Sequence, residues 1–385
     1  MRIAYITETF APEINGVALT AERTVRHLRQ AGHSVWLVRP RQRHEPARDD
    51  AQEWRCPGGP IPVYPDLRFG LAWPGSLRRR WAARPPDLVH VATPGPLAWA
   101  ALRAARSEGI ATSADFRTNF PAYSRHYRLG LLEPLVLAGL RRLHARADRS
   151  FVPTPALACE LSACGFERLQ VLGRGVDTRH FTPARRDADL RASWGAADGE
   201  PVLLHVGRLA PEKSADLALR CYEWLRCARP SLRMVVVGDG PLRERLQQAH
   251  PAAQFVGTQR GEALARHYAS ADLFLFPSLT DTFGNVTLEA LASGLALVAF
   301  DTAAAALHAR DGQSACLAPA GDVPAFFAAC LRALQCAPPD SALRRRAREA
   351  ALRADWEPVL RQFDEHLQAV AGAAAGRRLP RPALA

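Results

Sequence analysis

The clearest indication of the fold class is the stretch DLFLFPSLTDTFGNVTLEALASG, residues 272–294. It opens with an apolar run of the kind that forms a strand buried on both faces of a sheet. A polar turn around Gly284 follows. A helix is then expected from near Asn285 to Ser293, with Gly294 as its C-terminal cap. A strand, a turn and a helix in this order indicate a parallel sheet covered by helices.

The same alternation of apolar runs and amphipathic segments extends along the whole chain. The expected strands of a first domain are residues 3–8, 35–40, 87–94, 110–116 and 150–154, with a helix at 16–33. Those of a second domain are residues 201–209, 232–240, 253–257, 272–278 and 295–301. We therefore predict an α/β protein with two doubly wound, Rossmann-like domains that face each other across a cleft. The expected domains are residues 1–180 and 181–354, and a C-terminal helix at 355–375 is expected to pack back onto the first.

The composition is that of a soluble globular protein, with 385 residues, 48% of them hydrophobic and 23% charged. No apolar run approaches the roughly 18 residues that a membrane-spanning helix needs. The first ten residues, MRIAYITETF, lack the features of a signal peptide. The eight cysteines include no CxxC pair, which favours buried, reduced thiols. We therefore expect a cytoplasmic protein.

The net charge is +12, and most of the basic excess lies in residues 1–180. Such an excess indicates an acidic partner, which would be a phosphate-rich substrate or an anionic membrane. No nucleic-acid-binding motif is visible, so we expect no nucleic acid partner. The Arg- and Trp-rich stretch LRFGLAWPGSLRRRW, residues 67–81, resembles a membrane-surface patch and predicts peripheral membrane contact. The alternative is that arginines simply solvate surface helices.

Basic side chains follow the first strand of the second domain. Arg208 and Lys213 lie in GRLAPEKS, residues 207–214, and Lys213 is the only lysine among 50 basic Lys and Arg residues. A compact ammonium group meets a phosphate oxygen as a point charge, which a planar guanidinium does not reproduce. Ligands of doubly wound sheets bind at the carboxyl ends of the strands. These residues therefore predict a phosphate site, although a single lysine could also be a chance surface residue.

The opening stretch adds two carboxylates and a helix N-terminus to this region. The N-terminus of the helix after Gly284 offers unpaired N–H groups to an anion. Asp281 can accept hydrogen bonds from sugar hydroxyls, and Glu289 lies on the helix face where a ribose diol could meet it. The backbone near Gly257 could pair with a base edge. Together these features predict a nucleotide-sugar site, whereas each carboxylate alone would read as an ordinary cap or surface residue.

These motifs carry a resemblance that extends over nearly the whole chain. The matching segments are ETFAPEINGVALT (8–20), HVATPGPL (90–97), RTNFPAYSRHY (117–127), GRGVDTRHFTP (173–183), VGRLAPEKS (206–214), VGDGPL (237–242) and FPSLTDTFGNVTLEALASG (276–294). Through them the chain resembles glycosyltransferase family 4 of the GT-B fold. The resemblance implies a retaining transfer of a hexose from a nucleotide sugar to a lipid-linked or glycan hydroxyl, without a metal ion or another cofactor.

The resemblance also implies roles for single residues. Arg208, Lys213 and Asp281 would be catalytic, the first two by holding the diphosphate and the third by holding the sugar. The remaining donor-binding positions would be Gly16, Gly207, Gly257, Phe283, Gly284, Asn285 and Glu289. In the acceptor region, members of the family often have a histidine where this chain has Arg117, which is unable to act as a base at neutral pH. Tyr123 and His126 would share the acceptor contacts with it.

Two further points concern the chemistry. Family members usually have glutamate at the position of Asp281, and the shorter side chain changes which hydroxyl it reaches. The only Asp-x-Asp, Asp187-Ala188-Asp189, follows no apolar strand and so lacks the context of a metal-diphosphate site. Charge on the departing diphosphate would then be stabilised by Arg208, Lys213 and the helix N-terminus.

The run TDTFGNV most resembles that of GDP-mannose-dependent mannosyltransferases, so we expect GDP-mannose as the donor. Transferases that use UDP-sugars, of the glucosyl or sulfoquinovosyl type, are the alternative. A nucleotide-sugar epimerase can share the architecture, but only Glu8 and His126 offer themselves as its acid and base. A non-catalytic nucleotide-sugar sensor is a third possibility.

Overall fold

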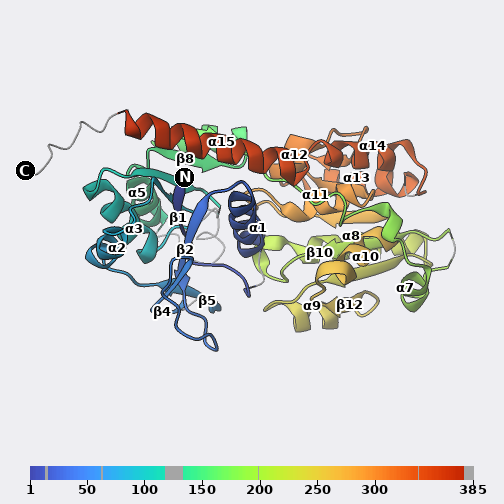
Figure 1. Ribbon diagram of the computed structural model, residues 1–385. Coiled ribbons are helices and arrows are strands. Elements are labelled where there is room, and N and C mark those ends of the chain that lie inside the picture. Colours follow the sequence, from blue (N-terminus) through green and yellow to red (C-terminus); the bar gives the residue numbers. More distant parts are fainter. Residues whose placement is uncertain (14–15, 62–63, 118–132, 198, 337, 377–385) are drawn as a thin grey trace, which may run out of the picture. The chain divides into compact units, whose positions relative to one another are not determined.

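The computed structural model spans residues 1–385 and describes all of them except 14–15, 62–63, 118–132, 198, 337 and 377–385 (Figure 1). The described residues form two compact units. Unit 1 runs from Met1 to Gly173 and resumes at Val359, and unit 2 spans Arg174–Pro358. The sequence pattern placed the division at residue 180, and the contacts of the structure place it between Gly173 and Arg174.

Unit 1 is built on a seven-stranded parallel sheet with the order β3-β2-β1-β6-β7-β8-β9. Its strands are β1 (Arg2–Ile6), β2 (Ser34–Pro40), β3 (Glu53–Cys56), β6 (Leu88–Val91), β7 (Ala111–Asp115), β8 (Arg149–Val152) and β9 (Leu169–Val171). The antiparallel hairpin of β4 (Gly58–Ile61) and β5 (Tyr64–Gly70) is separate from this sheet. All four residues of β6 are buried, in keeping with a sheet covered on both faces.

Helices cover both faces of this sheet (Figure 1). They are α1 (Gly16–Gln30), α2 (Pro74–Trp81), α3 (Pro96–Ser107), α5 (Glu133–His144), α6 (Pro155–Ala163) and α15 (Trp356–Ala375). The last helix of the chain belongs here, since Phe363 and Leu367 of α15 pack in one core with Ile3 and Tyr5 of β1. His33 and Asp364 add a contact of 2.7 Å between an imidazole nitrogen and a carboxylate oxygen.

Unit 2 contains a six-stranded parallel sheet with the order β12-β11-β10-β13-β14-β15. Its strands are β10 (Val202–Val206), β11 (Arg233–Val237), β12 (Gln254–Gly257), β13 (Leu273–Phe276), β14 (Ala296–Phe300) and β15 (Cys316–Ala318). The helices are α7 (Ala188–Ser193), α8 (Ala215–Ala228), α9 (Arg243–Ala249), α10 (Gly261–Ser270), α11 (Asn285–Ala292), α12 (Ala303–His308), α13 (Val323–Gln335) and α14 (Ala342–Leu352). The strand order reverses between β10 and β13, which makes the loops after these two strands the expected ligand position.

Alternate residues of β10 separate the two cores of unit 2. Val202 and Leu204 pack with Leu288 of α11 on one face of the sheet, whereas Leu203 packs with Leu219 of α8 on the other. The apolar runs of the sequence thus form strands buried on both faces. The predicted fold class, two doubly wound Rossmann-like domains, is confirmed.

The cysteines differ from expectation in part. All eight are free thiols, but Cys159, Cys164 and Cys227 are exposed rather than buried. None of the described helices combines the length and the apolar character that crossing a membrane requires.

Candidate functional site

The predicted donor residues of unit 2 come together at the carboxyl edge of its sheet. Arg208 follows β10, Lys213 ends the short 3-10 turn Pro211–Lys213, and Asp281 follows β13. Because β10 and β13 are paired in parallel, their loops leave the sheet side by side. The hydroxyl of Thr280 donates a hydrogen bond of 3.0 Å to the carbonyl of Glu212, which ties the two loops together.

A close ion pair joins the two loops. The Lys213 Nζ lies 2.5 Å from Oδ1 of Asp281, and each side chain is 15% exposed. The second carboxylate oxygen, Oδ2 of Asp281, is buried and has no hydrogen-bond partner within the part of the chain that the structure describes. A hydroxyl donor would satisfy it, because an ionised carboxylate has acceptor capacity on both oxygens.

Gly284 stands at the N-cap of α11 with φ of +86°, a conformation that side chains disfavour. A Cβ atom there would lie 3.3 Å from the ring of Phe276. As a glycine it offers no side-chain oxygen to the first N–H groups of α11. The N–H of Thr287 donates a bond of 3.0 Å to the carbonyl of Gly284, so an anion would meet the N–H groups of Asn285 and Val286. Phe283 is buried and Asn285 half-buried, and the carbonyl of Phe283 accepts a bond of 2.8 Å from Ala304, which holds this turn against α12.

Glu289 is more deeply placed than an ordinary helix carboxylate. The hydroxyl of Tyr268 on α10 donates a hydrogen bond of 3.0 Å to its Oε2. Burial raises the pKa of Glu289 to about 7, and the bond from Tyr268 partly opposes that rise. Tyr268 was not predicted from the sequence, because it sits in HYASADLF without any local sign of a polar partner.

His205 was also missed, because it lies within an apolar strand. It is fully buried on β10, and its Nδ1 bonds to the carbonyl of Leu275 at 2.9 Å. Burial lowers its pKa to about 4, so the imidazole is neutral and Nδ1 donates. Its Nε2 lies 3.7 Å from where a Cβ of Gly207 would be, which places this nitrogen beside the loop that carries Arg208.

The glycines of VGDGPL serve close packing. At Gly238, with φ of +139°, a Cβ would lie 1.9 Å from the carbonyl oxygen of Gly207. At Gly240 a Cβ would lie 2.5 Å from the carbonyl oxygen of Leu209. The turn after β11 is thus pressed against the backbone of the β10 loop. Gly257 takes part in the same arrangement, since its carbonyl accepts a bond of 2.9 Å from the N–H of Gly238.

In unit 1 the predicted residues are less concentrated. Gly16 is exposed at the first position of α1. The side chain of Arg117 is only 3% exposed, and its Nε donates a bond of 2.5 Å to Asp115 while Nη2 reaches the hydroxyl of Tyr5 at 3.2 Å. Its charge is therefore compensated inside the unit, and contact with an acceptor stays a prediction. Tyr123 and His126 lie outside the described residues.

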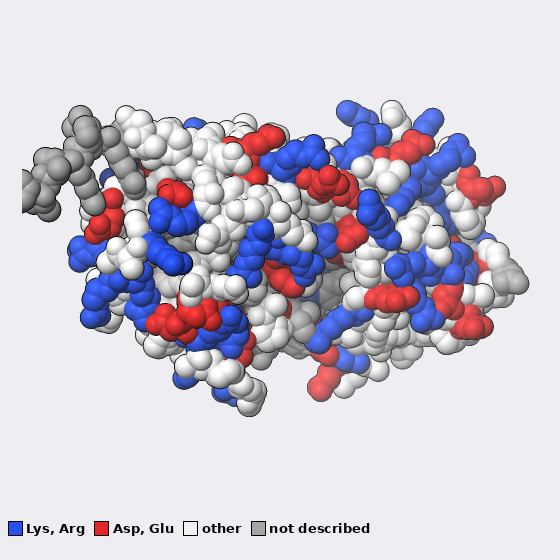
Figure 2. Space-filling view, in the orientation of Figure 1, with Lys and Arg blue, Asp and Glu red and all other residues white. Residues whose placement is uncertain are grey.

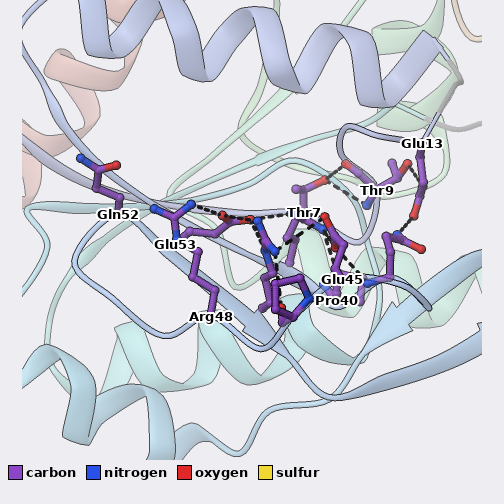
Figure 3. Close-up of polar contacts among 12 residues, drawn as sticks. Thr7, Thr9, Glu13, Pro40, Glu45, Arg48, Gln52 and Glu53 are labelled. Atoms are coloured by element: carbon purple, nitrogen blue, oxygen red, sulfur yellow. Dashed lines mark hydrogen bonds and ion pairs between the residues drawn. The ribbon is translucent and has the colours of Figure 1, made fainter.

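A polar cluster supports the loop that follows β1 (Figure 3). Two nitrogens of Arg39 each donate a bond of 2.7 Å to Glu45, and its Nε donates one of 2.8 Å to Glu53. With Phe10 and Pro12 these residues line a cavity of about 380 Å³. The carboxylates are already bonded to guanidinium groups, and the neighbouring Gln42 side chain donates a hydrogen bond to Glu13, which ties this region to the loop.

The Asp-x-Asp sequence has a structural task. Oδ1 of Asp187 accepts a bond of 2.9 Å from the N–H of Leu190 and so caps α7, and its other oxygen pairs with Arg266. Among the described residues, no cluster of three or more His, Cys, Asp or Glu side chains is placed to hold a metal ion.

Known protein families match the two units separately. Residues 14–180 match the family model described as Glycosyltransferase Family 4, and residues 200–336 match the model described as Glycosyl transferases group 1. A GDP-mannose-dependent alpha-mannosyltransferase of Mycolicibacterium smegmatis is 38% identical over 309 residues, which are 78% of this chain and 80% of that protein. A GDP-mannose-dependent alpha-(1-6)-phosphatidylinositol dimannoside mannosyltransferase of Mycobacterium tuberculosis is 28% identical over 368 residues, 93% of each chain.

The fold comparison agrees with these matches. The solved structure of a sucrose-phosphate synthase from Thermosynechococcus elongatus has a TM-score of 0.76 at 18% identity and covers 97% of this chain and 99% of its own. At that identity the likeness concerns the fold alone. Sequence and fold together confirm the predicted family, and the chain belongs to glycosyltransferase family 4 and is a glycosyltransferase of the GT-B fold.

Proposed function

We propose that this glycosyltransferase transfers mannose from GDP-mannose to a hydroxyl of a lipid-linked or glycan acceptor, with retention of configuration and without a metal ion. The observation that carries the proposal is the Lys213–Asp281 ion pair beside the open N-terminus of α11, at the point where the strand order reverses. The 38% identity to a GDP-mannose-dependent alpha-mannosyltransferase supports the choice of donor.

The donor is held by unit 2. The diphosphate binds Arg208, Lys213 and the first N–H groups of α11, and Gly207 and Gly284 let the backbone approach it. The ribose hydroxyls donate to Glu289, which Tyr268 holds in place. Lys213 then shares its charge between phosphate and Asp281, whose second oxygen accepts a hydroxyl of the sugar.

The chemical step needs no protein base. The acceptor oxygen bonds to the anomeric carbon on the side from which the diphosphate leaves, while the bond from that carbon to the phosphate oxygen breaks. The proton of the acceptor hydroxyl passes to the departing phosphate oxygen, and GDP is the second product. Arg208, Lys213 and the helix N-terminus stabilise the charge that develops on the diphosphate, a kind of term that usually dominates catalysis.

The acceptor is handled by unit 1, and its lipid character is argued from the surface around α2. Leu71 and Trp73 are 51% and 82% exposed, and Arg78 and Arg79 next to them are exposed as well. Basic side chains gather over the α2 region at the left of Figure 2. Exposed tryptophan next to arginine suits the interface of an anionic membrane.

Only part of the stretch 67–81 contributes to this surface. Leu77 and Trp81 are buried, and the guanidinium of Arg80 stacks on Trp54 at 3.9 Å and pairs with Asp49. Sedimentation with vesicles tests the contact. The wild type should bind vesicles of anionic phospholipid and ignore neutral ones. Trp73→Ala should weaken binding, whereas Trp224→Ala, at a 46% exposed residue of unit 2, should not.

Transfer itself is tested first by nucleotide binding. At 100 times its Kd, GDP should stabilise the fold by about 2.7 kcal/mol, which raises Tm by roughly 5–11 °C for a domain the size of unit 2. A shift with UDP but not GDP would overturn the mannose donor. No shift with GDP, UDP or ADP would overturn the nucleotide site altogether.

Variants test the residues. Lys213→Ala and Glu289→Ala should lose most of the GDP release that depends on acceptor, with their folded state retained. Arg220→Ala is the matched control, because it removes an exposed cation that pairs with Asp216 on the same helix. Near-normal turnover in both site variants would refute the assignment. Transfer that survives a chelator, with an anomeric product of the same configuration as the donor, would support the metal-free, retaining reaction.

A further inference from the structure

One buried carboxylate of unit 1 has no part in the reaction just described. Glu8 follows β1 and is only 7% exposed. Its Oε2 accepts a hydrogen bond of 2.5 Å from the N–H of Gly70, at the end of β5. Its Oε1 accepts one of 3.1 Å from the N–H of Leu97, in the first turn of α3. A single side chain thus joins three segments that are far apart in the sequence.

The structure leaves room for this carboxylate by placing glycine on two sides of it. A Cβ on Gly95 would lie 2.1 Å from Oε1 of Glu8, which excludes any other residue there while the carboxylate keeps its place. A Cβ on Gly70 would lie 3.2 Å from Oε2. The N–H of Glu8 itself donates a bond of 2.7 Å to the hydroxyl of Thr93, so its backbone is held too.

The joined segments lead to two surfaces. Directly after Gly70 come Leu71 and Trp73, the exposed apolar residues of the surface proposed to meet the membrane. Directly after Glu8 comes the Thr9–Glu13 loop. This loop is held internally by a bond of 2.7 Å from the Thr7 hydroxyl to the carbonyl of Thr9 and by a bond between Thr9 and Glu13 (Figure 3).

We propose that Glu8 is a positioning residue that couples these two surfaces. By holding Gly70 against the end of β1, its carboxylate sets the place of the Leu71–Trp73 segment relative to the Thr9–Glu13 loop. A lipid acceptor whose chains lie at Leu71 and Trp73 would then offer its hydroxyl at a defined place along that loop. The inference rests on the proposed function, in which unit 1 handles a lipid-linked acceptor. Glu8 touches no substrate and acts through the backbone of both segments.

The variant Glu8→Gln tests the coupling. Glutamine keeps the size of the side chain but has one oxygen in place of two. Its NH₂ group therefore faces one of the two backbone N–H groups, and because both groups are donors that hydrogen bond is lost. The probes are a mannosyl diacylglycerol in anionic phospholipid vesicles and octyl mannoside in solution. With the vesicle acceptor, KM should rise about 10- to 100-fold, the loss of one charge-assisted bond. With octyl mannoside, and for GDP-mannose, KM should stay as in wild type.

Two further variants separate the coupling from a mere loss of charge and from a general structural role. Glu22→Gln removes the same charge from an exposed pair with Arg26 on α1 and should change nothing. Gly95→Ala keeps the charge of Glu8 but places a Cβ on its carboxylate, and it should reproduce the defect that is limited to the vesicle acceptor. Equal losses with both acceptors would overturn the proposal, since a general structural role would act on both.

Amide hydrogen exchange provides a readout that needs no acceptor. In Glu8→Gln, exchange should quicken both at Gly70–Trp73 and at Thr9–Glu13, because one contact protects both segments. Unchanged protection of both segments would overturn the coupling even if transfer were impaired. If wild type fails to bind vesicles or to transfer mannose while exchange responds as expected, the proposed acceptor fails and the coupling stands.

Discussion

Removal of the Tyr268 hydroxyl should shift the pH range over which the protein binds GDP. In the proposed donor site, the ribose hydroxyls donate to an ionised Glu289, and protonation of that carboxyl weakens binding. The pKa of Glu289 is raised to about 7 by burial, and the hydrogen bond of 3.0 Å from Tyr268 is the opposing contribution. In Tyr268→Phe only the burial remains, so the pKa of Glu289 should rise further.

The size of this shift follows from the single bond that is lost. A hydrogen bond to a charged group is worth about 1.5–3 kcal/mol, and one pKa unit corresponds to about 1.4 kcal/mol. The pKa of Glu289 should therefore move from about 7 to roughly 8–9. At pH 7.5 most wild-type molecules carry an ionised Glu289, whereas only a small fraction of the variant does. Affinity for GDP should then be about tenfold lower in the variant, and the difference should vanish above about pH 9.5.

Calorimetric titration with GDP between pH 6 and pH 10 measures this shift directly. The matched control is Tyr222→Phe, which removes the hydroxyl of another buried tyrosine of unit 2, one that bonds to the carbonyl of Ala252 at 3.2 Å. Its pH profile should coincide with that of wild type. If the Tyr268→Phe profile has its midpoint at the wild-type pH or below it, ribose does not bind an ionised Glu289, and this part of the donor site is wrong.

Three other perturbations follow from the structure. In urea titrations, Gly238→Ala should lower the free energy of unfolding by more than about 2 kcal/mol, because the new Cβ would lie 1.9 Å from the carbonyl oxygen of Gly207. Gly372→Ala, where a Cβ meets open space on α15, should raise the free energy of unfolding by about 0.5–1 kcal/mol. Lys213→Met leaves Asp281 unpaired and should lower the free energy of unfolding by about 3 kcal/mol. The double variant Lys213→Met/Asp281→Asn should regain most of that stability but not the transfer activity, and additive losses of stability in the two single variants would contradict the pairing. Burial raises the pKa of Glu8 to about 7, with Glu13 and Cys56 nearby. The free energy of unfolding of wild type relative to Glu8→Gln should therefore fall as pH rises from about 4.5 to 7, by at most about 1.4 kcal/mol per pH unit. A difference that does not vary with pH would show that folding does not raise the pKa of Glu8.

Much of the fold could be predicted because buried parallel strands are continuous apolar runs. The runs 201–209 and 272–278 became β10 and β13, and the helix expected near Asn285 begins there. The missed strands lack that signal. β3 (Glu53–Cys56) carries Glu53 at the sheet edge, where ion pairs with arginines replace apolar contacts, and β15 (Cys316–Ala318) has only three residues. The hairpin strand β4, GGPI, is built from residues that ordinarily mark turns.

The candidate site was predictable where it depends on strand order alone. Arg208, Lys213 and Asp281 follow strands that lie next to each other at the reversal point, so their proximity follows from topology. The partners that hold these groups were not predictable. Tyr268 reaches Glu289 from another helix, and nothing in the local sequence marks such a contact.

Arg117 shows the same limit in unit 1. Its residue type alone excluded general base chemistry. Its almost complete burial against Asp115 and Tyr5 depends on the strand order, which places only β6 between β7 and β1. The sequence of the stretch 67–81 likewise predicted a single basic and aromatic surface patch. The fold divides it, because Leu77 and Trp81 turn into the core while Trp73 stays outside.

Glu8 and Glu289 share a property that the sequence hides. Burial raises the pKa of each carboxyl group to about 7. Ionisation of either group at neutral pH therefore destabilises the folded state, whereas a glutamine at the same position carries no charge and has no such effect. Proteins retain such destabilising charged groups mainly at positions where the charge has a function. For Glu289 the proposed use is recognition of the donor, and for Glu8 it is the hold on the backbone N–H groups of Gly70 and Leu97. Glu8→Gln should therefore be at least as stable as wild type near pH 8 and yet transfer poorly to a lipid acceptor, a combination that a carboxylate kept only for stability would not produce.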